Sequence, residues 1–220
     1  MSEITYEFIR EYLQAIQKDE DQFIDHIRQE ALTNGVPIIK NEVKQLIEVL
    51  LTIKKPKHIL EVGTAVGYSS LIMSKYLDDG GTITTIERSK DMIDVANKYI
   101  KTAGKESIIN ILEGDAMSIL PTLNQQFDFI FMDAAKGQYI SFLPYCLKLL
   151  KVDGILVSDN VLQDGYVAKS RWSIPRRQRT IHGRMREYLW ELNHNKLLKT
   201  VILPIADGAT ISCKIKEGDV

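Results

Sequence analysis

Short apolar runs alternate with amphipathic segments between His58 and Ser158, and this alternation limits the possible folds more than any other feature. The runs predict strands at residues 58–62, 82–87, 108–112, 127–132 and 154–158. The segments between them predict helices at 67–77, 89–102, 116–123 and 139–150. Strands that alternate with helices build βαβ units, so we expect an α/β fold whose mostly parallel sheet carries helices on both faces.

The two ends of the chain are expected to complete the same domain. Apolar residues at helical spacing predict helices at 3–17, 19–33 and 38–54, which pack on this domain or on a second subunit. A helix near 175–193 and strands at 198–203 and 209–215 follow the sheet. Only a short connection, with a turn at 206–208, joins these last strands, so they should pair antiparallel. We therefore predict a single domain over residues 1–220, with N-terminal helices over about 1–54.

Composition argues against several classes of protein. Cys146 and Cys213 are the two cysteines of the chain, and they form neither a disulfide framework nor a zinc-binding spacing. This favours a reducing, cytoplasmic environment. No apolar run is long enough to cross a bilayer, and acidic residues within the first thirteen positions argue against a signal peptide. We therefore expect no membrane partner.

A glycine-containing turn follows the first predicted strand and indicates a nucleotide-like ligand. The sequence from Glu61 to Ser69 is EVGTAVGYS, in which Gly63 allows the backbone to approach a ligand closely. Glu87 ends the second strand, where a carboxylate can accept hydrogen bonds from ribose hydroxyls. The G-x-x-x-G spacing differs from the dinucleotide fingerprint, which favours a ligand without a pyrophosphate. The alternative is an ordinary turn glycine and a solvated glutamate.

Polar residues that end later strands extend this candidate site. Asp115 follows the third strand and either meets an adenine amine, caps a helix, or does both. Asp133 and Asp159 each end an apolar run, and Asn160 follows directly. If these two strands are neighbours, their ends lie about 4.8 Å apart. Two carboxylates and an amide oxygen suit Mg²⁺ or another divalent cation. The alternative is that both aspartates cap helices or turns.

One lysine lies close enough to this candidate metal site to take part in chemistry. Lys136 follows Asp133 by about one helical turn. A neighbouring divalent cation disfavours an ammonium group, so Lys136 is a candidate general base. An ordinary surface lysine is the alternative.

A strongly basic segment runs from Gly165 to Arg186. It holds seven basic residues and no acidic one, so its charge is +7 and the rest of the chain sums to −8, given the net charge of −1. This asymmetry indicates an anionic partner. Tyr166 and Trp172 offer either stacking surface or ordinary packing. The basic residues are Lys169, Arg171, Arg176, Arg177, Arg179, Arg184 and Arg186.

The order of these motifs resembles the cation-dependent O-methyltransferases, a family that includes catechol and caffeoyl-CoA O-methyltransferases. The resemblance covers about residues 35–215 and rests on the sequences EVGTAVGYS, IE, GDA, DAAKGQY and DNVL. Within the family, the chain most resembles bacterial enzymes that methylate 5-hydroxyuridine in tRNA. DAAKGQY and the arginine-rich stretch around residues 176–179 carry that closer similarity.

The resemblance implies a fold, ligands and an assembly. The fold is that of class I S-adenosylmethionine-dependent methyltransferases, a Rossmann-like sheet of seven strands whose last strand is antiparallel. Family members are commonly homodimers, and plant members have Asp where Ala135 stands, which argues against a plant-like phenylpropanoid acceptor. A divalent cation is implied at Asp133, Asp159 and Asn160, with Lys136 near the reacting oxygen. S-adenosyl-L-methionine is implied near Ile39, Gly63, Ser69, Glu87, Asp115, Ala116 and Asp133.

The acceptor must offer two adjacent oxygens, and both a catechol and 5-hydroxyuridine do. The basic segment favours RNA, because lysine and arginine contacts to phosphate supply much of RNA affinity. Together with this segment, the resemblance to the tRNA-modifying enzymes implies methylation of 5-hydroxyuridine at the wobble position in the anticodon region of tRNA. A small catechol-type acceptor is the alternative. A non-catalytic RNA-binding module is a third hypothesis, which the intact metal motif disfavours. The expected RNA contacts are Arg171, Arg176, Arg177 and Arg179.

Overall fold

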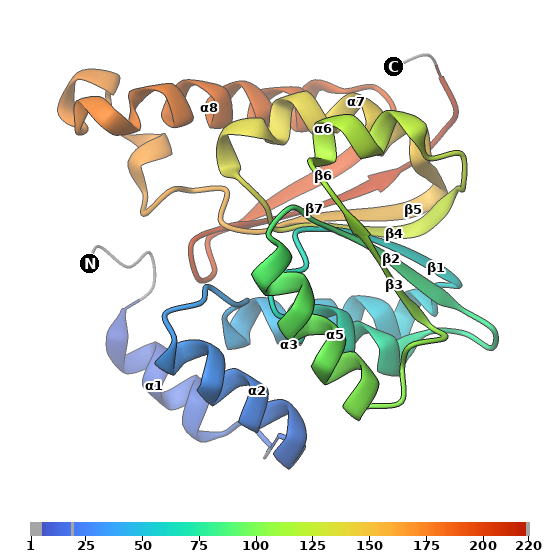
Figure 1. Ribbon diagram of the computed structural model, residues 1–220. Coiled ribbons are helices and arrows are strands. Elements are labelled where there is room, and N and C mark those ends of the chain that lie inside the picture. The colour runs from blue at the N-terminus through green and yellow to red at the C-terminus, as the bar shows by residue number, and fades with distance from the viewer. Residues whose placement is uncertain (1–5, 19, 219–220) are drawn as a thin grey trace.

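A seven-stranded sheet runs through the computed structural model, which describes residues 6–18 and 20–218 (Figure 1). The strand order is β3-β2-β1-β4-β5-β7-β6. Strands β1 to β5 pair in parallel, whereas β7 lies between β5 and β6 and is antiparallel to both, so the predicted fold class is confirmed. The strands are β1 (His58–Val62), β2 (Thr82–Glu87), β3 (Ile109–Glu113), β4 (Phe127–Met132), β5 (Leu150–Ser158), β6 (Leu198–Leu203) and β7 (Ala209–Lys214).

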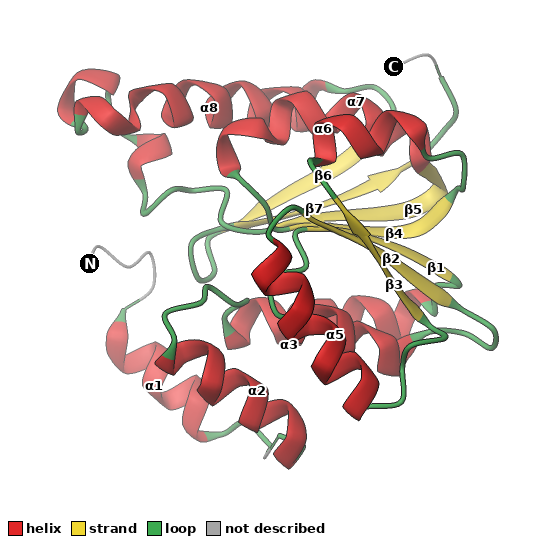
Figure 2. Ribbon diagram, in the orientation of Figure 1, coloured by secondary structure: helices red, strands yellow, loops and turns green. Residues whose placement is uncertain are grey.

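Helices cover both faces of the sheet (Figure 2). One side carries α1 (Glu7–Ala15), α2 (Gln22–Thr33), α3 (Asn41–Lys54), α4 (Tyr68–Met73) and α5 (Lys90–Thr102). The other side carries α6 (Ala116–Ile119), α7 (Tyr139–Leu149) and α8 (Arg179–His194). Short 3-10 turns complete the described elements: η1 (Ser74–Tyr76), η2 (Leu120–Thr122), η3 (Lys136–Gln138), η4 (Tyr166–Ala168), η5 (Arg171–Ser173) and η6 (Arg176–Gln178).

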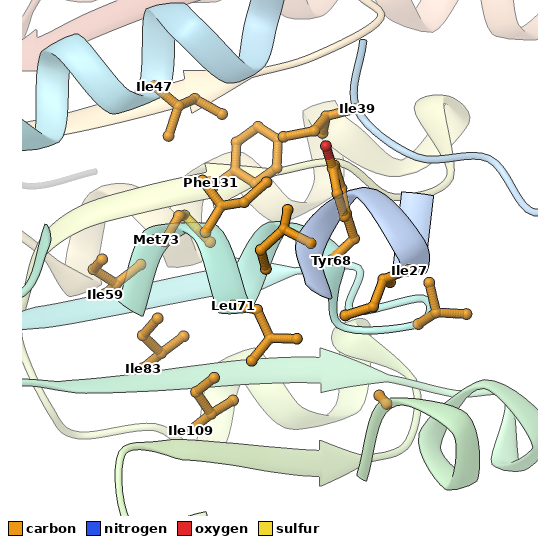
Figure 3. Close-up of a cluster of buried hydrophobic side chains, with 14 of the residues drawn as sticks. Ile27, Ile39, Ile47, Ile59, Tyr68, Leu71, Met73, Ile83, Ile109 and Phe131 are labelled. Carbon is orange, nitrogen blue, oxygen red and sulfur yellow. The ribbon is translucent and has the colours of Figure 1, made fainter. Parts of the chain in front are cut away.

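Two hydrophobic clusters, one on each side of the sheet, hold these layers together. Successive side chains of a strand point to opposite faces, so Ile59 joins the cluster of α2 to α5 and Leu60 joins the cluster of α7 and α8. Figure 3 shows Ile59, Ile83 and Ile109 in a row across neighbouring strands, with Leu71 of α4 beside them. This packing fixes the strand ends that carry the candidate site.

Several predicted boundaries are wrong, and local chemistry explains the differences. The helix predicted at 116–123 is α-helical only to Ile119, where a 3-10 turn containing Pro121 takes over. The helix predicted near 175–193 begins at Arg179, because Pro175 is extended, with ψ 137°. Likewise α4 ends at Met73 and β5 begins earlier than predicted, at residue 150. The helix α2 begins after Asp21, which caps the N–H groups of residues 23 and 24; predicted residues 3–5 and 19 lie outside the described chain.

The helix α1 contributes no buried residue to the described structure. Its apolar side chains are instead exposed, with Phe8 at 67% and Tyr12 at 65%. An amphipathic helix normally buries its apolar face, so this one has a face that the described residues leave uncovered. Within the described residues, no helix is both long and apolar enough to span a membrane.

Candidate active site

A cavity of about 510 Å³ lies at the carboxyl ends of β1, β2 and β4, the edge at which open α/β sheets bind ligands. It brings together most of the residues that the sequence singled out. Asp159, which is 2% exposed, adjoins the cavity through Asn160 but does not line it. The four predicted RNA-contacting arginines do not line it either. The predicted residues on its wall are Ile39, Gly63, Ser69, Glu87, Asp115, Ala116, Asp133, Lys136 and Asn160.

The loop after β1 passes directly against the backbone after β4. Gly63 has a φ of 107°, and a Cβ at this position would overlap the carbonyl oxygen of Asp133. The N–H groups of Gly63 and Thr64 donate to the carbonyl of Ile86, at 3.0 and 3.2 Å. Glycine is therefore required here by a contact between strand ends, and that contact brings the loop after β1 and Asp133 together.

Glu87 fixes this loop and keeps capacity for a ligand. Its carboxylate accepts hydrogen bonds from the N–H of Ala65 at 3.0 Å and from those of Arg88 and Ser89 at 2.9 Å. Both backbone bonds from Arg88 and Ser89 go to Oε1, whereas among the described residues Oε2 accepts only the N–H of Ala65, so Oε2 can still accept a bond from a ribose hydroxyl. Asp115 accepts from the N–H of Met117 at 2.8 Å and caps α6. The predicted capping role of Asp115 is thus confirmed, and the residue also lines the cavity.

Strands β4 and β5 are neighbours, which is the condition that the predicted metal site required. Met132 pairs with Ser158 in the parallel register, so Asp133 and Asp159 follow at equivalent positions. Asn160, with a φ of 60°, donates its side-chain N–H to Oδ1 of Asp133 at 3.2 Å and its backbone N–H to Oδ1 of Asp159 at 2.6 Å. One asparagine therefore bridges the two carboxylates.

The chemistry of these residues fits a divalent cation. Burial raises the pKa of Asp133 and of Asp159, and the charge of Asp133 raises the pKa of Asp159 further. A bound cation would offset the cost of burying two like charges. Within residues 6–18 and 20–218, no group of three His, Cys, Asp or Glu side chains has metal-site geometry. A site of two carboxylates and an amide suits Mg²⁺, which usually keeps several waters.

Lys136 opens η3 and is held on one side of the cavity by an ion pair. Its Nζ lies 2.7 Å from Oδ2 of Asp207. Asp207 belongs to the turn between β6 and β7 and is 7% exposed. The sequence indicated only a turn there, because Asp before Gly is common in turns and nothing local links residue 207 to residue 136.

A buried carboxyl group, that of Glu61, lies in the strand that leads into the candidate site. Glu61 is completely buried in β1, where it accepts hydrogen bonds from the hydroxyls of Ser69, Ser70 and Thr85. Thr85 also bonds the hydroxyl of Thr64, at 2.6 Å. Glu61 therefore links the loop after β1 to α4 and β2. The sequence motif contains Glu61 but gave it no role, because its position inside the sheet follows from strand pairing.

Glu61 is expected to make stability depend on pH. Burial raises its pKa from 4.5 to about 7, against the opposing effect of its hydroxyl partners. The folded protein then holds a proton that the unfolded chain releases, so this contribution to stability is complete below pH 4.5 and lost as pH rises through 7. Relative to Glu61→Gln, the wild-type free energy of unfolding should fall by about 3 kcal/mol from pH 4.5 to 8. Urea denaturation of both proteins measures this; a constant difference would contradict it.

The basic segment forms a separate surface beside the site. None of its seven cations has a carboxylate within ion-pair distance among the described residues. Arg184 donates to the carbonyl of Gly137 at 2.9 Å, next to Lys136, so the surface begins at the edge of the site. Trp172 is 79% exposed, and the Arg179 guanidinium lies 5.2 Å from its ring centroid. A surface pocket of about 420 Å³ in this segment is lined by Lys169, Ser170, Arg171, Trp172, His182, Gly183 and Arg186.

Comparison with known proteins identifies the family. The family model described as O-methyltransferase matches residues 14–215, nearly the whole chain. The chain belongs to the O-methyltransferase family. A curated catechol O-methyltransferase from Niastella koreensis is 32% identical over 173 residues, covering 76% of this chain and 78% of the relative. The caffeoyl-CoA O-methyltransferase of Stellaria longipes is 31% identical over 177 residues, covering 78% and 73%.

A solved structure extends this similarity to the fold. A Staphylococcus aureus protein, provisionally described as a caffeoyl-CoA O-methyltransferase, superposes with a TM-score of 0.87 at 33% identity. The match covers 94% of this O-methyltransferase and all of that chain. The resemblance seen in the sequence motifs is therefore confirmed at the level of family and fold.

Proposed function

We propose that this O-methyltransferase transfers the methyl group of S-adenosyl-L-methionine to one of two adjacent oxygens of its acceptor. One observation carries the proposal: a single cavity holds Glu87, suited to a ribose, together with Asp133, Lys136 and Asn160. A nucleoside-bearing methyl donor and an oxygen acceptor can thus be bound side by side. Holding two reactants in line supplies much of the rate enhancement in such transfers.

Different residues of the candidate site would bind the cation, orient the methyl donor and stabilise the acceptor oxygen. Asp133, Asp159 and Asn160 would hold a divalent cation, whose charge stabilises negative charge on the acceptor oxygens. Glu87 and Asp115 would orient the nucleoside part of the donor from the neighbouring wall. Lys136, held at the rim by its ion pair with Asp207, would stabilise negative charge on the acceptor oxygen, whose proton leaves to water.

Nucleoside mass spectrometry tests this proposal and the acceptor together. The protein would be incubated with S-adenosyl-L-methionine, Mg²⁺ and either tRNA containing 5-hydroxyuridine or a catechol, with EDTA as control. Metal-dependent methylation of either acceptor supports the reaction class. Methylation that is unchanged by EDTA would overturn the role of the cation. The absence of methyl transfer to any acceptor would favour a non-catalytic binding module instead.

For the acceptor, the basic segment favours 5-hydroxyuridine at the wobble position of tRNA. Its cations lack carboxylate partners in the described structure, so they remain available for phosphates. The exposed Trp172 offers a flat surface for an unstacked base. Such an enzyme would act in the cytoplasm, where tRNA is found.

A small catechol-type acceptor is the second candidate, and the names of the curated relatives favour it. Catechol and caffeoyl-CoA O-methyltransferases are among them. The same cavity and the same three metal-site residues would serve a catechol equally well, because both acceptors present two adjacent oxygens. The charge of the basic segment would then have no role in acceptor binding.

Charge reversal at Arg176 and Arg177 separates these candidates. Both side chains are exposed, neither lines the cavity, and neither forms an ion pair in the described structure, so folding should be unaffected. We expect the double change to Glu to lower kcat/KM for tRNA about 100-fold or more at low salt, since each lost phosphate contact weakens RNA binding. Catechol methylation should be unchanged. Reversal of Lys196 and Lys199, outside the segment, is the matched control. Equal loss on both acceptors would contradict an RNA role.

We further propose that α1 contacts a second copy of the chain. The helix leaves its apolar side chains exposed, as described above, and a homodimer would bury them. Replacing Phe8 and Tyr12 with Asp should convert a dimer into a monomer, because each substitution places a charge on the apolar face. Light scattering after size-exclusion chromatography measures the mass. A monomeric wild type, or a variant that remains dimeric, would contradict this proposal.

A further inference from the structure

The turn between β6 and β7 reaches the candidate site although it lies far from every recognised motif. Antiparallel pairing of β5 with β7 places Thr210 opposite Ser158, so the turn that precedes β7 lies at the carboxyl end of β5. The backbone N–H of Val161 donates to the carbonyl of Gly208 at 3.0 Å, and that of Leu162 donates to the carbonyl of Asp207 at 2.9 Å. The turn is therefore joined directly to the segment that follows Asn160.

The side chain of Asp207 links this segment to Lys136. One carboxylate oxygen accepts the backbone N–H of Asp164, and the other lies 2.7 Å from Nζ of Lys136. The Asp207 side chain is 8% exposed and that of Lys136 31%, so the carboxylate is the buried, fixed partner. The turn also packs closely on this segment, since a Cβ at Gly208 would overlap the side chain of Leu162.

Lys136 needs such an anchor because two other anions are near it. The charges of Asp133 and Asp159 both interact with Lys136, yet within the described chain its ion pair is with Asp207. A lysine side chain has four rotatable bonds and loses about 2 kcal/mol of rotamer entropy when fixed. Without Asp207, the ammonium would be free to move onto the carboxylates of the candidate metal site, where it would compete with a cation.

We propose that Asp207 is a positioning residue that holds Lys136 at the acceptor side of the cavity and away from Asp133 and Asp159. The role of Lys136 toward the acceptor rests on the proposed function, but the anchoring of its ammonium does not. An ammonium has three donors and no lone pair, so Lys136 held in this way serves as a fixed positive charge. Asp207 acts through Lys136 and does not touch the reacting atoms.

Asp128 provides a matched control at the other end of the sheet. It forms an ion pair with Lys151 at 2.8 Å and accepts the backbone N–H groups of Lys57 and His58. It therefore resembles Asp207 in having one lysine partner and backbone donors. Asp207→Asn and Asp128→Asn keep the shape of each side chain and remove its charge.

Competitive labelling with acetic anhydride, read by peptide mass spectrometry, tests the anchor without any assay of activity. A paired ammonium reacts slowly, because it must lose both its proton and its partner. Asp207→Asn should raise the labelling rate of Lys136 several-fold and leave Lys151 unchanged, and Asp128→Asn should do the reverse. Unchanged labelling of Lys136 in folded Asp207→Asn would overturn the anchor. Asp207→Glu, which keeps the charge, serves if the amide variant does not fold.

A double-mutant cycle with Lys136→Ala tests the functional part. In the wild-type background, Asp207→Asn should lower kcat about tenfold or more with little change in KM for the methyl donor. In the Lys136→Ala background, the same substitution should lower kcat by less than about a further twofold, because Asp207 acts only through Lys136. An equal loss in both backgrounds would overturn the positioning role. If the wild-type protein methylates neither acceptor, the proposed function is wrong. The labelling result still shows whether Asp207 holds the ammonium of Lys136.

Discussion

Replacing Asp159 with Asn is expected to lower kcat by about three orders of magnitude. A cation can supply several kcal/mol of stabilisation to negative charge on oxygen, and each 1.36 kcal/mol is about tenfold in rate. The substitution keeps the shape of the side chain and an oxygen that can accept the N–H of Asn160. It removes one of the two negative charges that would hold the cation. The measurement is kcat on the acceptor identified by mass spectrometry, at saturating methyl donor and Mg²⁺.

In the absence of metal, Asp159→Asn is expected to keep or raise the thermal stability of the protein, although it lowers kcat. Because burial raises the pKa of Asp159, its ionised form costs free energy in the folded protein, and a neutral amide avoids that cost. In EDTA the variant should therefore melt at or above the wild-type temperature. Mg²⁺ should raise the Tm of the wild type and not that of the variant, since a ligand stabilises only a state that binds it.

Asp153 supplies the control for this experiment. It lies on the same strand, is exposed, and has a φ of 61° that Asn tolerates well. Asp153→Asn should keep wild-type kcat and the wild-type response to Mg²⁺. An Asp159→Asn enzyme within tenfold of wild type would show that the paired carboxylates are not needed for the reaction.

Gly63→Ala is expected to damage both stability and donor binding. The added Cβ would overlap the carbonyl oxygen of Asp133, and a φ of 107° is unfavourable for alanine. Relief requires the ends of β1 and β4 to separate, which should cost about 3 kcal/mol or more of folding stability. The same shift displaces the loop after β1, so affinity for S-adenosyl-L-methionine should fall about 100-fold, by about 3 kcal/mol. Urea denaturation and calorimetric titration measure the two effects.

Gly80→Ala separates the steric effect from the backbone effect. Gly80 also has a positive φ, of 70°, but an added Cβ would meet nothing within 4 Å. This control should lose only about 1 kcal/mol, the usual cost of alanine in a left-handed conformation, and keep wild-type donor affinity. If Gly63→Ala behaves like Gly80→Ala, the contact with Asp133 does not matter to the site.

The elements that could be predicted from the sequence are those with a local signal. Buried parallel strands produce short apolar runs, and these runs end at or near recognisable residues, namely the glycine Gly63 and the acidic Glu87, Asp115, Asp133 and Asp159. Element boundaries are predicted less accurately where polar residues interrupt an apolar run. The strand β5 begins at Leu150, but Lys151 and Asp153 interrupt its apolar pattern, so the sequence predicts a strand only from residue 154.

The α/β alternation, the glycine loop and the pair of acidic strand ends are predictable from local patterns, because each depends on a few adjacent residues. The three-dimensional structure was needed to show that β4 and β5 are neighbours and that β7 lies antiparallel beside β5. That pairing brings Asp207 to Lys136 across 71 positions of sequence. Contacts at such separation depend on strand order, which no local pattern of residues specifies, and they arise from the packing of the whole sheet.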